Sequence, residues 1–502
     1  MTPSLSPLAE PYDLAVIGGG INGAGIAADA AGRGLTVFLA EQHDLAGHTS
    51  SASSKLIHGG LRYLEHYEFR LVREALAERE VLLAKAPHIV HPLRFILPHR
   101  PHLRPAWLIR AGLFLYDHLG RRQTLPASRG LRLGADSPLQ PAMTRGFEYS
   151  DCWVDDARLV VLNVMAAREH GAQVHTRTRC IGAQRSEGLW HVHLERADGS
   201  RLSIRSRVLV NACGPWVASF LEDAVRQPSP HAIRLVQGSH IVVPRLYAGE
   251  HAYILQNEDR RIVFVIPWLD QFSLIGTTDH DFHGDPARAQ IGDEEIDYLL
   301  GVVNQHFTRQ IGRADIRHTY SGVRPLQDDE STDPSAVTRD YSLELSTQDG
   351  APLLSVFGGK LTTYRKLAEA ALEQLRPHLP KMGPRWTAEA PLPGGEGLRD
   401  PLQLAAELVR QAPWLPMQLA RRWAGSYGSR SWRLLDAAGS LADLGEHFGA
   451  GLYAREVDYL RGEEWACSAE DILWRRSKLG LFMSRPEQAR LAALFDASPI
   501  AQ

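Results

Sequence analysis

Three glycines near the N-terminus have the spacing of a dinucleotide-binding loop. Gly18, Gly20 and Gly23 fit the pattern G-x-G-x-x-G and directly follow the apolar run 13–17. The first permits a tight turn, the second lets the backbone approach a pyrophosphate, and the third lets helix and strand pack closely. Glu41 ends the next apolar run, where a carboxylate accepts hydrogen bonds from a ribose. A glycine-rich turn without a ligand is the weaker interpretation.

The same fingerprint serves FAD and NAD, so the loop itself leaves the choice of cofactor open. It occurs once in the 502 residues. An enzyme that uses both cofactors needs two such sites, and the single fingerprint therefore disfavours an NAD-linked flavoreductase.

A second polar loop, residues 49–60, combines hydroxyl groups and a lysine with paired glycines. Gly59 and Gly60 allow close backbone approach, and the hydroxyl groups can bond a pyrophosphate, a ribityl chain or a flavin ring. A polar surface loop is the alternative interpretation. The polar side chains that we expect at the cofactor are Ser50, Ser51, Ser54, Lys55 and His58.

Longer motifs are more specific than the glycine fingerprint. The run SSKLIHGGLRYL at 53–64 resembles that of the aerobic FAD-dependent glycerol-3-phosphate dehydrogenases, most of all their bacterial, quinone-linked members. The same resemblance is carried by YSDCWVDDAR at 149–158, GSHI at 238–241, YSGVRP at 320–325 and VFGGKLTTY at 356–364. It covers essentially the whole chain. It implies one FAD per chain and the oxidation of sn-glycerol 3-phosphate to dihydroxyacetone phosphate.

The resemblance also implies further cofactor contacts. A helix that follows a buried apolar run late in the chain faces the flavin pyrimidine in this family, and its dipole stabilises the anionic reduced flavin. Gly214 and Trp216 resemble a third turn that contacts the flavin. The residues at the helix N-terminus are Gly358, Gly359, Lys360, Leu361 and Thr362.

A phosphorylated triol needs cations for its phosphate, and the arginine fork binds phosphate oxygens in pairs. Arg324, Arg339 and Lys360 match the phosphate and substrate cluster of the family. Arg62 and Tyr63 match residues that line the same pocket beside the flavin. Taken singly, each arginine is more often a solvated or ion-paired surface residue.

Oxidation at C2 of the substrate requires a hydride acceptor, which is flavin N5, and a base for the hydroxyl proton. Histidine suits the second task, because its pKa lies near neutrality. His240 is the first candidate and His58 the second. A hydrogen-bonded sheet histidine is the alternative interpretation of His240. We expect His240, Arg324 and Lys360 to act in catalysis.

Residues 99–122 mix arginines with apolar and aromatic side chains, and residues 473–483 have a similar texture. Basic amphipathic helices bind anionic bilayer surfaces, although they more often pack on their own protein. The sequence has no uninterrupted apolar run of about 18 residues and no signal peptide. The family implies a quinone acceptor. We therefore expect a cytoplasmic protein, a homodimer, attached peripherally to the inner face of the cytoplasmic membrane.

Composition and charge bear on other functions. The formal net charge is −3, with 44% hydrophobic and 23% charged residues, so a nucleic-acid partner is not expected. The four cysteines are scattered and stand in no Cys/His cluster, which predicts reduced thiols and no metal site.

The elements that must position these residues begin with a βαβ unit, with strands at 13–17 and 36–40 around a small-residue helix at 21–33. Apolar runs between 233 and 278 indicate a separate antiparallel sheet. Further helices are predicted at 70–84, 155–169 and 361–376, and further strands at 189–196, 201–205, 208–211 and 352–357.

We predict that residues 1–376 form an FAD-binding domain interleaved with an antiparallel-sheet substrate domain, the latter mainly at 80–150 and 230–345. A linker rich in proline and glycine follows at 377–400, and a helical C-terminal domain at 401–502. The fold class is α/β plus α, with a Rossmann-like FAD-binding domain of the glutathione-reductase/D-amino-acid-oxidase type.

Two other functions stay open. An amine or amino-acid oxidase of the glycine-oxidase type shares the flavin fold, but it needs one carboxylate-binding arginine rather than a cluster of cations. The second is a non-catalytic flavoprotein. Arg324, Lys360 and His240 argue against it.

Overall fold

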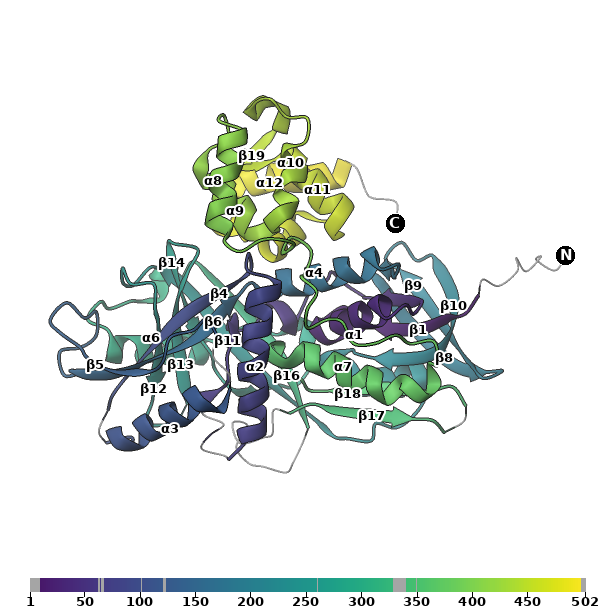
Figure 1. Cartoon of the computed structure of the whole chain (residues 1–502), viewed down its shortest axis with the longest axis horizontal. Coiled ribbons are helices and arrows are strands. Elements are labelled where there is room, and N and C mark those ends of the chain that lie inside the picture. Colours follow the sequence, from purple (N-terminus) through teal and green to yellow (C-terminus); the bar gives the residue numbers. More distant parts are fainter. Residues whose placement is uncertain are drawn as a thin grey trace.

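The computed structural model describes residues 10–61, 64, 67–100, 102–120, 123–259, 261–327, 340–348 and 350–497. Two large sheets lie side by side, and a smaller helical part covers one edge of them (Figure 1).

The first sheet is built on the predicted βαβ unit. β1 (Tyr12–Ile17) and β2 (Val37–Ala40) pair in parallel and are joined by α1 (Ile21–Gly32). The strand order is β17-β18-β10-β1-β2-β7, and β8 and β9 extend the sheet from β10. The other strands are β7 (Gln173–His175), β8 (Thr178–Ser186), β9 (Leu189–Arg196), β10 (Arg201–Asn211), β17 (Ser342–Ser346) and β18 (Leu353–Phe357).

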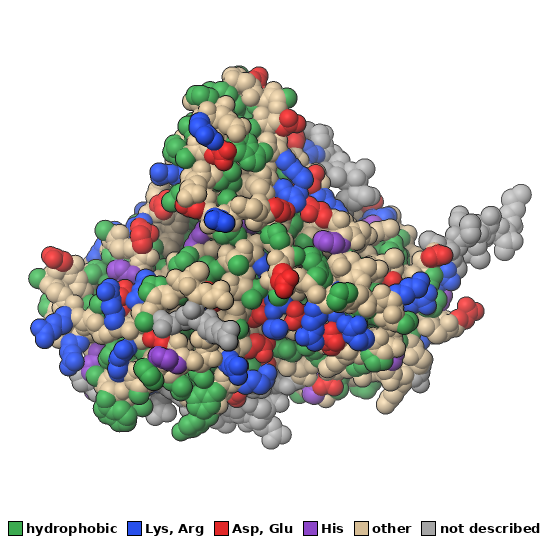
Figure 2. Space-filling view, in the orientation of Figure 1, with side chains coloured by type: hydrophobic (Ala, Val, Ile, Leu, Met, Phe, Trp, Pro, Cys, Tyr) green, Lys and Arg blue, Asp and Glu red, His purple; other side chains and the backbone are tan. Residues whose placement is uncertain are grey.

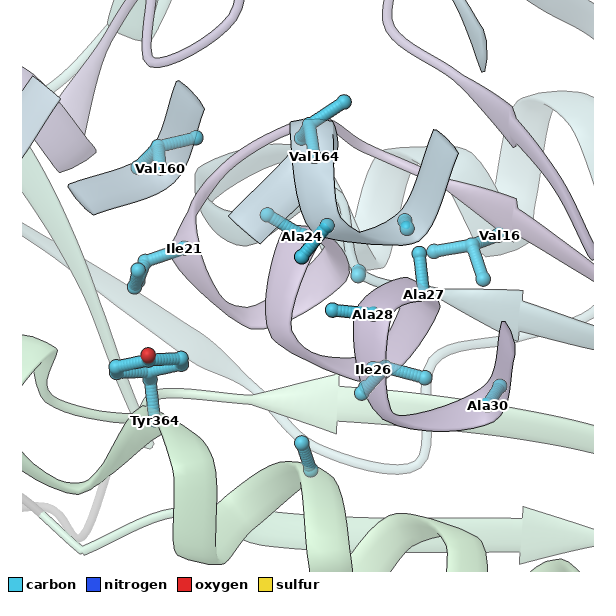
Figure 3. Close-up of a cluster of buried hydrophobic side chains, with 14 of the residues drawn as sticks. Val16, Ile21, Ala24, Ile26, Ala27, Ala28, Ala30, Val160, Val164 and Tyr364 are labelled. Atoms are coloured by element: carbon cyan, nitrogen blue, oxygen red, sulfur yellow. The ribbon is translucent and has the colours of Figure 1, made fainter. Parts of the chain in front are cut away.

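Small residues along α1 let it pack closely between α4 (Asp156–Glu169) and α7 (Tyr364–Leu375). Figure 3 shows Val160 and Val164 of α4 on one side of α1 and Tyr364 of α7 on the other. A Cβ atom on Gly25 would lie 2.7 Å from the Tyr364 ring. This packing fixes the N-terminus of α1, which is the end that carries the glycine fingerprint.

The second sheet is mostly antiparallel, as the apolar runs predict. Its order is β15-β11-β14-β13-β12-β4-β6-β3, with β16 on β11 and β5 on β6. Its first strands along the chain are β3 (Leu56–Ile57), β4 (Val90–Pro98), β5 (Arg129–Arg132) and β6 (Arg145–Val154). The others are β11 (Ile233–Pro244), β12 (Ala252–Gln256), β13 (Ile262–Trp268), β14 (Phe272–Gly276), β15 (His280–Asp281) and β16 (His318–Gln327).

Helices cover both faces of the second sheet. α2 (Phe69–Lys85) and α3 (Ala106–Leu119) share a core with one face, and α6 (Asp293–His306) packs on the other. The polar loop 49–60 supplies β3 to this sheet. The loop thereby connects the second sheet to α1 and the first sheet.

The C-terminal part has its own core and lies above α4 in Figure 1. Its helices are α8 (Pro401–Gln411), α9 (Met417–Tyr427), α10 (Ser431–Leu435), α11 (Ala454–Glu464) and α12 (Arg485–Ala497). A short hairpin of β19 (His447–Gly449) and β20 (Leu452–Tyr453) interrupts a region that the sequence predicts to be almost entirely helical.

Predicted elements and observed elements differ in two further places. The strands expected at 201–205 and 208–211 are one strand, β10, because its first half pairs with β9 and its second half with β1 and β18. The helix expected from Leu361 begins as a 3-10 turn, Leu361–Thr363, before α7. Within the described ranges, no helix is both long and apolar enough to span a bilayer.

Candidate functional site

Two adjoining cavities meet at the N-terminus of α1. The first contains the glycine fingerprint and Glu41, and the second contains His58, His240 and Lys360. Their volumes are about 200 and 250 Å³. The residues that line both are Ile21, Thr49, Ser50, Pro325, Gly358 and Gly359.

The three glycines of the fingerprint have separate steric roles. Gly18 has φ +113°, and a Cβ atom there would lie 2.3 Å from the carbonyl oxygen of Ala212. A Cβ atom on Gly23 would lie 1.9 Å from the carbonyl oxygen of Gly18, so only glycine allows this approach of helix and strand. Gly20 lies on the wall of the first cavity, with Ser50 Oγ 3.1 Å from its Cβ position.

Glu41 lies on the wall of the first cavity at the end of β2. Its carboxylate accepts hydrogen bonds from the backbone N–H groups of Gly19 (2.6 Å) and His43 (2.8 Å). Burial raises the pKa of this carboxyl group, and these hydrogen bonds oppose the effect. The carboxylate is therefore held in one place, where a ribose hydroxyl can donate to it.

Asn22 and Gly359 supply a test of whether a dinucleotide fits here. Asn22 Nδ2 donates to the carbonyl oxygen of Gly358 (3.0 Å), while Asn22 Oδ1 is buried and has no hydrogen-bond partner among the described residues. Gly359 has φ +100°, and its Cβ position lies 2.8 Å from Asn22 Nδ2. A buried acceptor without a donor is costly. The glycine cradle, the held carboxylate and this acceptor together fit FAD.

The side chains of the 49–60 loop face in two directions. Ser50 Oγ accepts from the N–H of Ile21 (3.0 Å), and Ser54 lines the second cavity. Ser51 and Lys55 face a third cavity on the other side of the loop. Lys55 Nζ donates to Asp156 (2.7 Å) and to the carbonyl oxygen of Ser51 (3.1 Å). The Lys55 ammonium group therefore anchors the loop instead of pointing into the two cavities.

The end of this loop packs tightly against α3. The N–H of Gly59 donates to the hydroxyl of Tyr116 (2.8 Å), and a Cβ atom on Gly59 would lie 2.6 Å from that oxygen. Gly60 has φ +71°. His58 lines the second cavity, and its N–H donates to Thr362 Oγ1 (3.3 Å).

Two further turns close the cavities. Lys360, Leu361 and Thr362 line the second cavity at the start of α7. Gly214 (φ +56°) and Trp216 follow β10 and line the first cavity. The glycine fingerprint, the 49–60 loop and these two turns thus line two adjoining cavities.

His240 on β11 lies on the wall of the second cavity. Its ring stacks on Tyr320, with 4.8 Å between ring centroids, and its Nε2 lies 2.9 Å from Ser54 Oγ. A Cβ atom on Gly276, its neighbour on β14, would lie 2.2 Å from the imidazole. Burial, and then the positive charges of Lys55 and Arg324, lower the pKa of His240 to about 3. The imidazole is therefore neutral at physiological pH.

Arg324 on β16 also lines the second cavity. Its guanidinium forms an ion pair with Asp279 and donates to the carbonyl oxygen of Thr278 (3.2 Å). Its side chain is 24% exposed. The ion pair orients the arginine fork at the cavity, where it can bind an anion.

The structure brings Ser54, His58, His240, Arg324 and Lys360 to one cavity. Arg62, Tyr63 and Arg339 lie outside the described residues. Sequence reasoning did not identify Asn22, Tyr320, Gly276 or Asp279. Asn22 and Tyr320 belong to motifs that the sequence shows and could have been identified from them. No local sequence signal places Gly276 beside His240 or Asp279 beside Arg324.

Comparison with known proteins agrees with this architecture. A family model described as FAD dependent oxidoreductase matches residues 13–365. A model described as the C-terminal domain of alpha-glycerophosphate oxidase matches residues 385–497. The predicted fold class is confirmed.

Several known proteins match this chain over most of its length. A glycerol-3-phosphate dehydrogenase from Pseudomonas aeruginosa is 71% identical, over 98% of this chain and 96% of that protein. D-erythritol 1-phosphate dehydrogenase from Brucella abortus is 51% identical, over 97% of this chain and 99% of that protein. The structure of the glycerol-3-phosphate dehydrogenase from Bacillus halodurans complexed with FAD has a TM-score of 0.75 at 26% identity, over 98% and 96%.

Proposed function

Because the chain belongs to the family of FAD-dependent glycerol-3-phosphate dehydrogenases, we propose that it oxidises sn-glycerol 3-phosphate to dihydroxyacetone phosphate and passes the electrons to a membrane quinone. The observation that carries this proposal is the second cavity. The second cavity is lined by the neutral imidazole of His240 and by the cationic side chains of Arg324 and Lys360. It adjoins the dinucleotide cavity at Gly358, which lines both.

The residues of the second cavity divide the chemistry between them. Arg324 and Lys360 bind the phosphate group, and the ion pair with Asp279 keeps the Arg324 fork directed at it. When bound, FAD would supply the acceptor for the hydride from C2. The neutral imidazole of His240 takes the proton of the C2 hydroxyl. A phosphate dianion next to Arg324 offsets one of the positive charges that lower the pKa of His240.

The cofactor contacts that we propose are those predicted from the sequence, except that the side chains of Ser51 and Lys55 are left out. Ser50 and Ser54 line the first two cavities, whereas Ser51 and Lys55 line the third cavity on the opposite side of the loop. We also propose the domain limits that the sequence predicts, and contacts of Arg62, Tyr63 and Arg339 with the substrate.

Peripheral membrane attachment is proposed for α3. Trp107 (71% exposed) and Phe114 (58%) project from it, with Leu108 and Leu115 beside them. In Figure 2 hydrophobic side chains gather at the lower edge, where Figure 1 draws α3, with Lys and Arg nearby. The segment 473–483 is a poor candidate, because Arg476 is fully buried within the protein.

The function is tested with purified holoprotein. We expect a yellow protein with one FAD per chain, whose flavin is bleached by sn-glycerol 3-phosphate and reoxidised by a soluble quinone. Matched assays with D-erythritol 1-phosphate and glycine compare kcat/KM for a longer polyol phosphate and for an amino acid. If kcat/KM is higher for either compound than for sn-glycerol 3-phosphate, that compound takes the place of the proposed substrate. Sedimentation of the same preparation tests the homodimer that we propose.

A further inference from the structure

A network of buried charges connects the C-terminal part to the beginning of the 49–60 loop. The Arg476 side chain is fully buried, and its guanidinium donates to both carboxylate oxygens of Asp44 (2.7 and 2.8 Å). The same guanidinium donates to the carbonyl oxygen of Glu464 (2.7 Å). Asp44 precedes Ala46 and Gly47, which line the first cavity. The arginine fork therefore fixes the chain where it enters the cofactor loop.

The same C-terminal segment is also linked, through Asp155 and Asp156, to Ser53 and Lys55 of the loop. Lys478 Nζ donates to both oxygens of Asp155, the residue that caps α4. The next residue, Asp156, accepts from Lys55 Nζ (2.7 Å) and from Ser53 Oγ (2.7 Å). Three of these charged groups are nearly inaccessible to water, at 6% exposure for Lys478, 4% for Lys55 and 0% for Asp156. The second contact therefore fixes the loop at Ser53 and Lys55, just before β3.

Between these two contacts lie the residues that face the cavities. His48, Thr49 and Ser50 line the first cavity. His48 and Thr49 also line the third cavity on the other side of the loop, together with Lys55, Arg475 and Lys478. The loop thus separates the cofactor space from the C-terminal segment. A shift at either contact moves the cavity wall.

Buried ion pairs contribute little to net stability, because the desolvation of both charges offsets their attraction. Removal of one partner is costly where it leaves a buried charge uncompensated. Without Arg476, Asp44 would keep its ion pair with Arg475 but lose the paired hydrogen bonds of the Arg476 fork. Such pairs are suited to fixing geometry. At this interface they fix the geometry of one loop from a separate part of the chain.

We propose that the segment Arg475–Lys478 is a positioning element for the FAD-binding loop: Arg476 and Lys478 hold the two ends of residues 44–55, so that FAD affinity depends on the C-terminal part. This inference rests on the proposed use of FAD. Neither residue lines the first or the second cavity, and their effect is transmitted through Asp44 and through Asp155 with Asp156.

The test measures the dissociation constant for FAD in full-length protein, by titration of the flavin-free form with FAD and detection of flavin fluorescence. We expect Arg476→Met and Lys478→Met to raise the dissociation constant at least about tenfold, in line with the loss of a charge-assisted contact. Arg476→Lys keeps the charge but loses the fork, and we expect an intermediate value.

The matched control is Arg422→Met. Arg422 pairs with Glu456, a fully buried carboxylate inside the C-terminal core, away from the loop. We expect this variant to lower the melting temperature and to leave the FAD dissociation constant within about twofold of the wild type, a change below about 0.5 kcal/mol. Limited proteolysis of each flavin-free variant establishes that the chain is folded before titration.

Two results would overturn the inference. One is an unchanged dissociation constant in folded Arg476→Met or Arg476→Lys protein. The other is an equal increase in Arg422→Met, because general destabilisation would then account for the effect. A wild-type protein that does not bind FAD would instead contradict the proposed function. The wild-type titration therefore distinguishes the two failures.

Discussion

Nε2 of His240 lies 2.9 Å from the hydroxyl oxygen of Ser54, across 186 positions of sequence. His240 belongs to β11 of the second sheet, and Ser54 to the 49–60 loop, which follows β2 of the first sheet. The other ring nitrogen, Nδ1, is buried and has no hydrogen-bond partner among the described residues. Ser54 is therefore the polar group that orients the imidazole at the cavity.

Ser54→Ala removes this contact and should lower the rate of flavin reduction by about three- to tenfold, because a neutral hydrogen bond is worth about 0.5–1.5 kcal/mol. KM for the substrate should change little. Stopped-flow reduction under saturating substrate measures the effect. Ser51→Ala is the matched control, since its hydroxyl donates to the His48 carbonyl oxygen and faces the third cavity. Equal rates in the two variants would argue against an orienting role for Ser54.

His240→Ala should slow flavin reduction at least about a hundredfold without much weakening of substrate binding, because general-base catalysis contributes about 10²–10⁴-fold. His58→Ala is the comparison. Its ring lies at the cavity wall and its backbone bonds Thr362, so its loss should weaken FAD retention more than hydride transfer. Both variants are compared at full flavin occupancy. A rate of flavin reduction near the wild-type value in the His240 variant would show that another residue is the base.

The pH profile gives a separate test of His240. A histidine in water has a pKa of about 6.5. Burial and the charges of Lys55 and Arg324 lower the pKa of His240 to about 3, so the basic, neutral form persists well below pH 6. Activity that needs this form is lost only as pH falls through the lowered pKa. We expect kcat/KM to show no histidine limb near pH 6.5, and a limb there that His240→Ala abolishes would contradict the burial argument.

Some of the site could be predicted from sequence because its signals are local. Gly23 is forced by its contact with Gly18 within one βαβ unit, whereas Gly18 is forced by its positive φ and its contact with Ala212 after β10; the spacing of the two glycines alone reveals both. Lys55 shows the limit of this reasoning. A polar loop indicates many hydrogen-bonding groups, but the direction of each side chain depends on Asp156, which lies 101 positions away. The local sequence pattern therefore predicts a polar loop near the cofactor. Which of its side chains face the cofactor is decided by tertiary contacts.

The pairing of strands has the same limit. Asp279 meets Arg324 because β16 and β15 both pair with β11, a register that no single segment of the sequence specifies. The hydrophobic runs predict that strands exist between 233 and 278. The order in which they pair comes from packing against α6 on one face and α2 and α3 on the other.

Arg324→Ala should raise KM for sn-glycerol 3-phosphate by at least about tenfold while FAD stays bound. A charge-assisted hydrogen bond is worth about 1.5–3 kcal/mol, and the fork can make two. Arg234→Ala is the matched control, because Arg234 forms a similar ion pair, with Asp281, outside the second cavity. Steady-state kinetics and the flavin content of each variant decide the question. A change of less than threefold in the Arg324 variant would show that this residue does not bind the phosphate.

The last prediction concerns the exposed face of α3. Burial of a large apolar side chain is worth about 1.5–3 kcal/mol, so Trp107→Ser and Phe114→Ser should each weaken binding to anionic lipid vesicles by about ten- to a hundredfold. Their activity with a soluble quinone should stay at the wild-type level, because neither side chain lines the cavities. Leu402→Ser is the matched control, since Leu402 is 62% exposed on α8 in the C-terminal part. Vesicle co-sedimentation measures all three variants. If Leu402→Ser lost binding while the α3 variants kept it, the membrane-facing surface would lie on the C-terminal part.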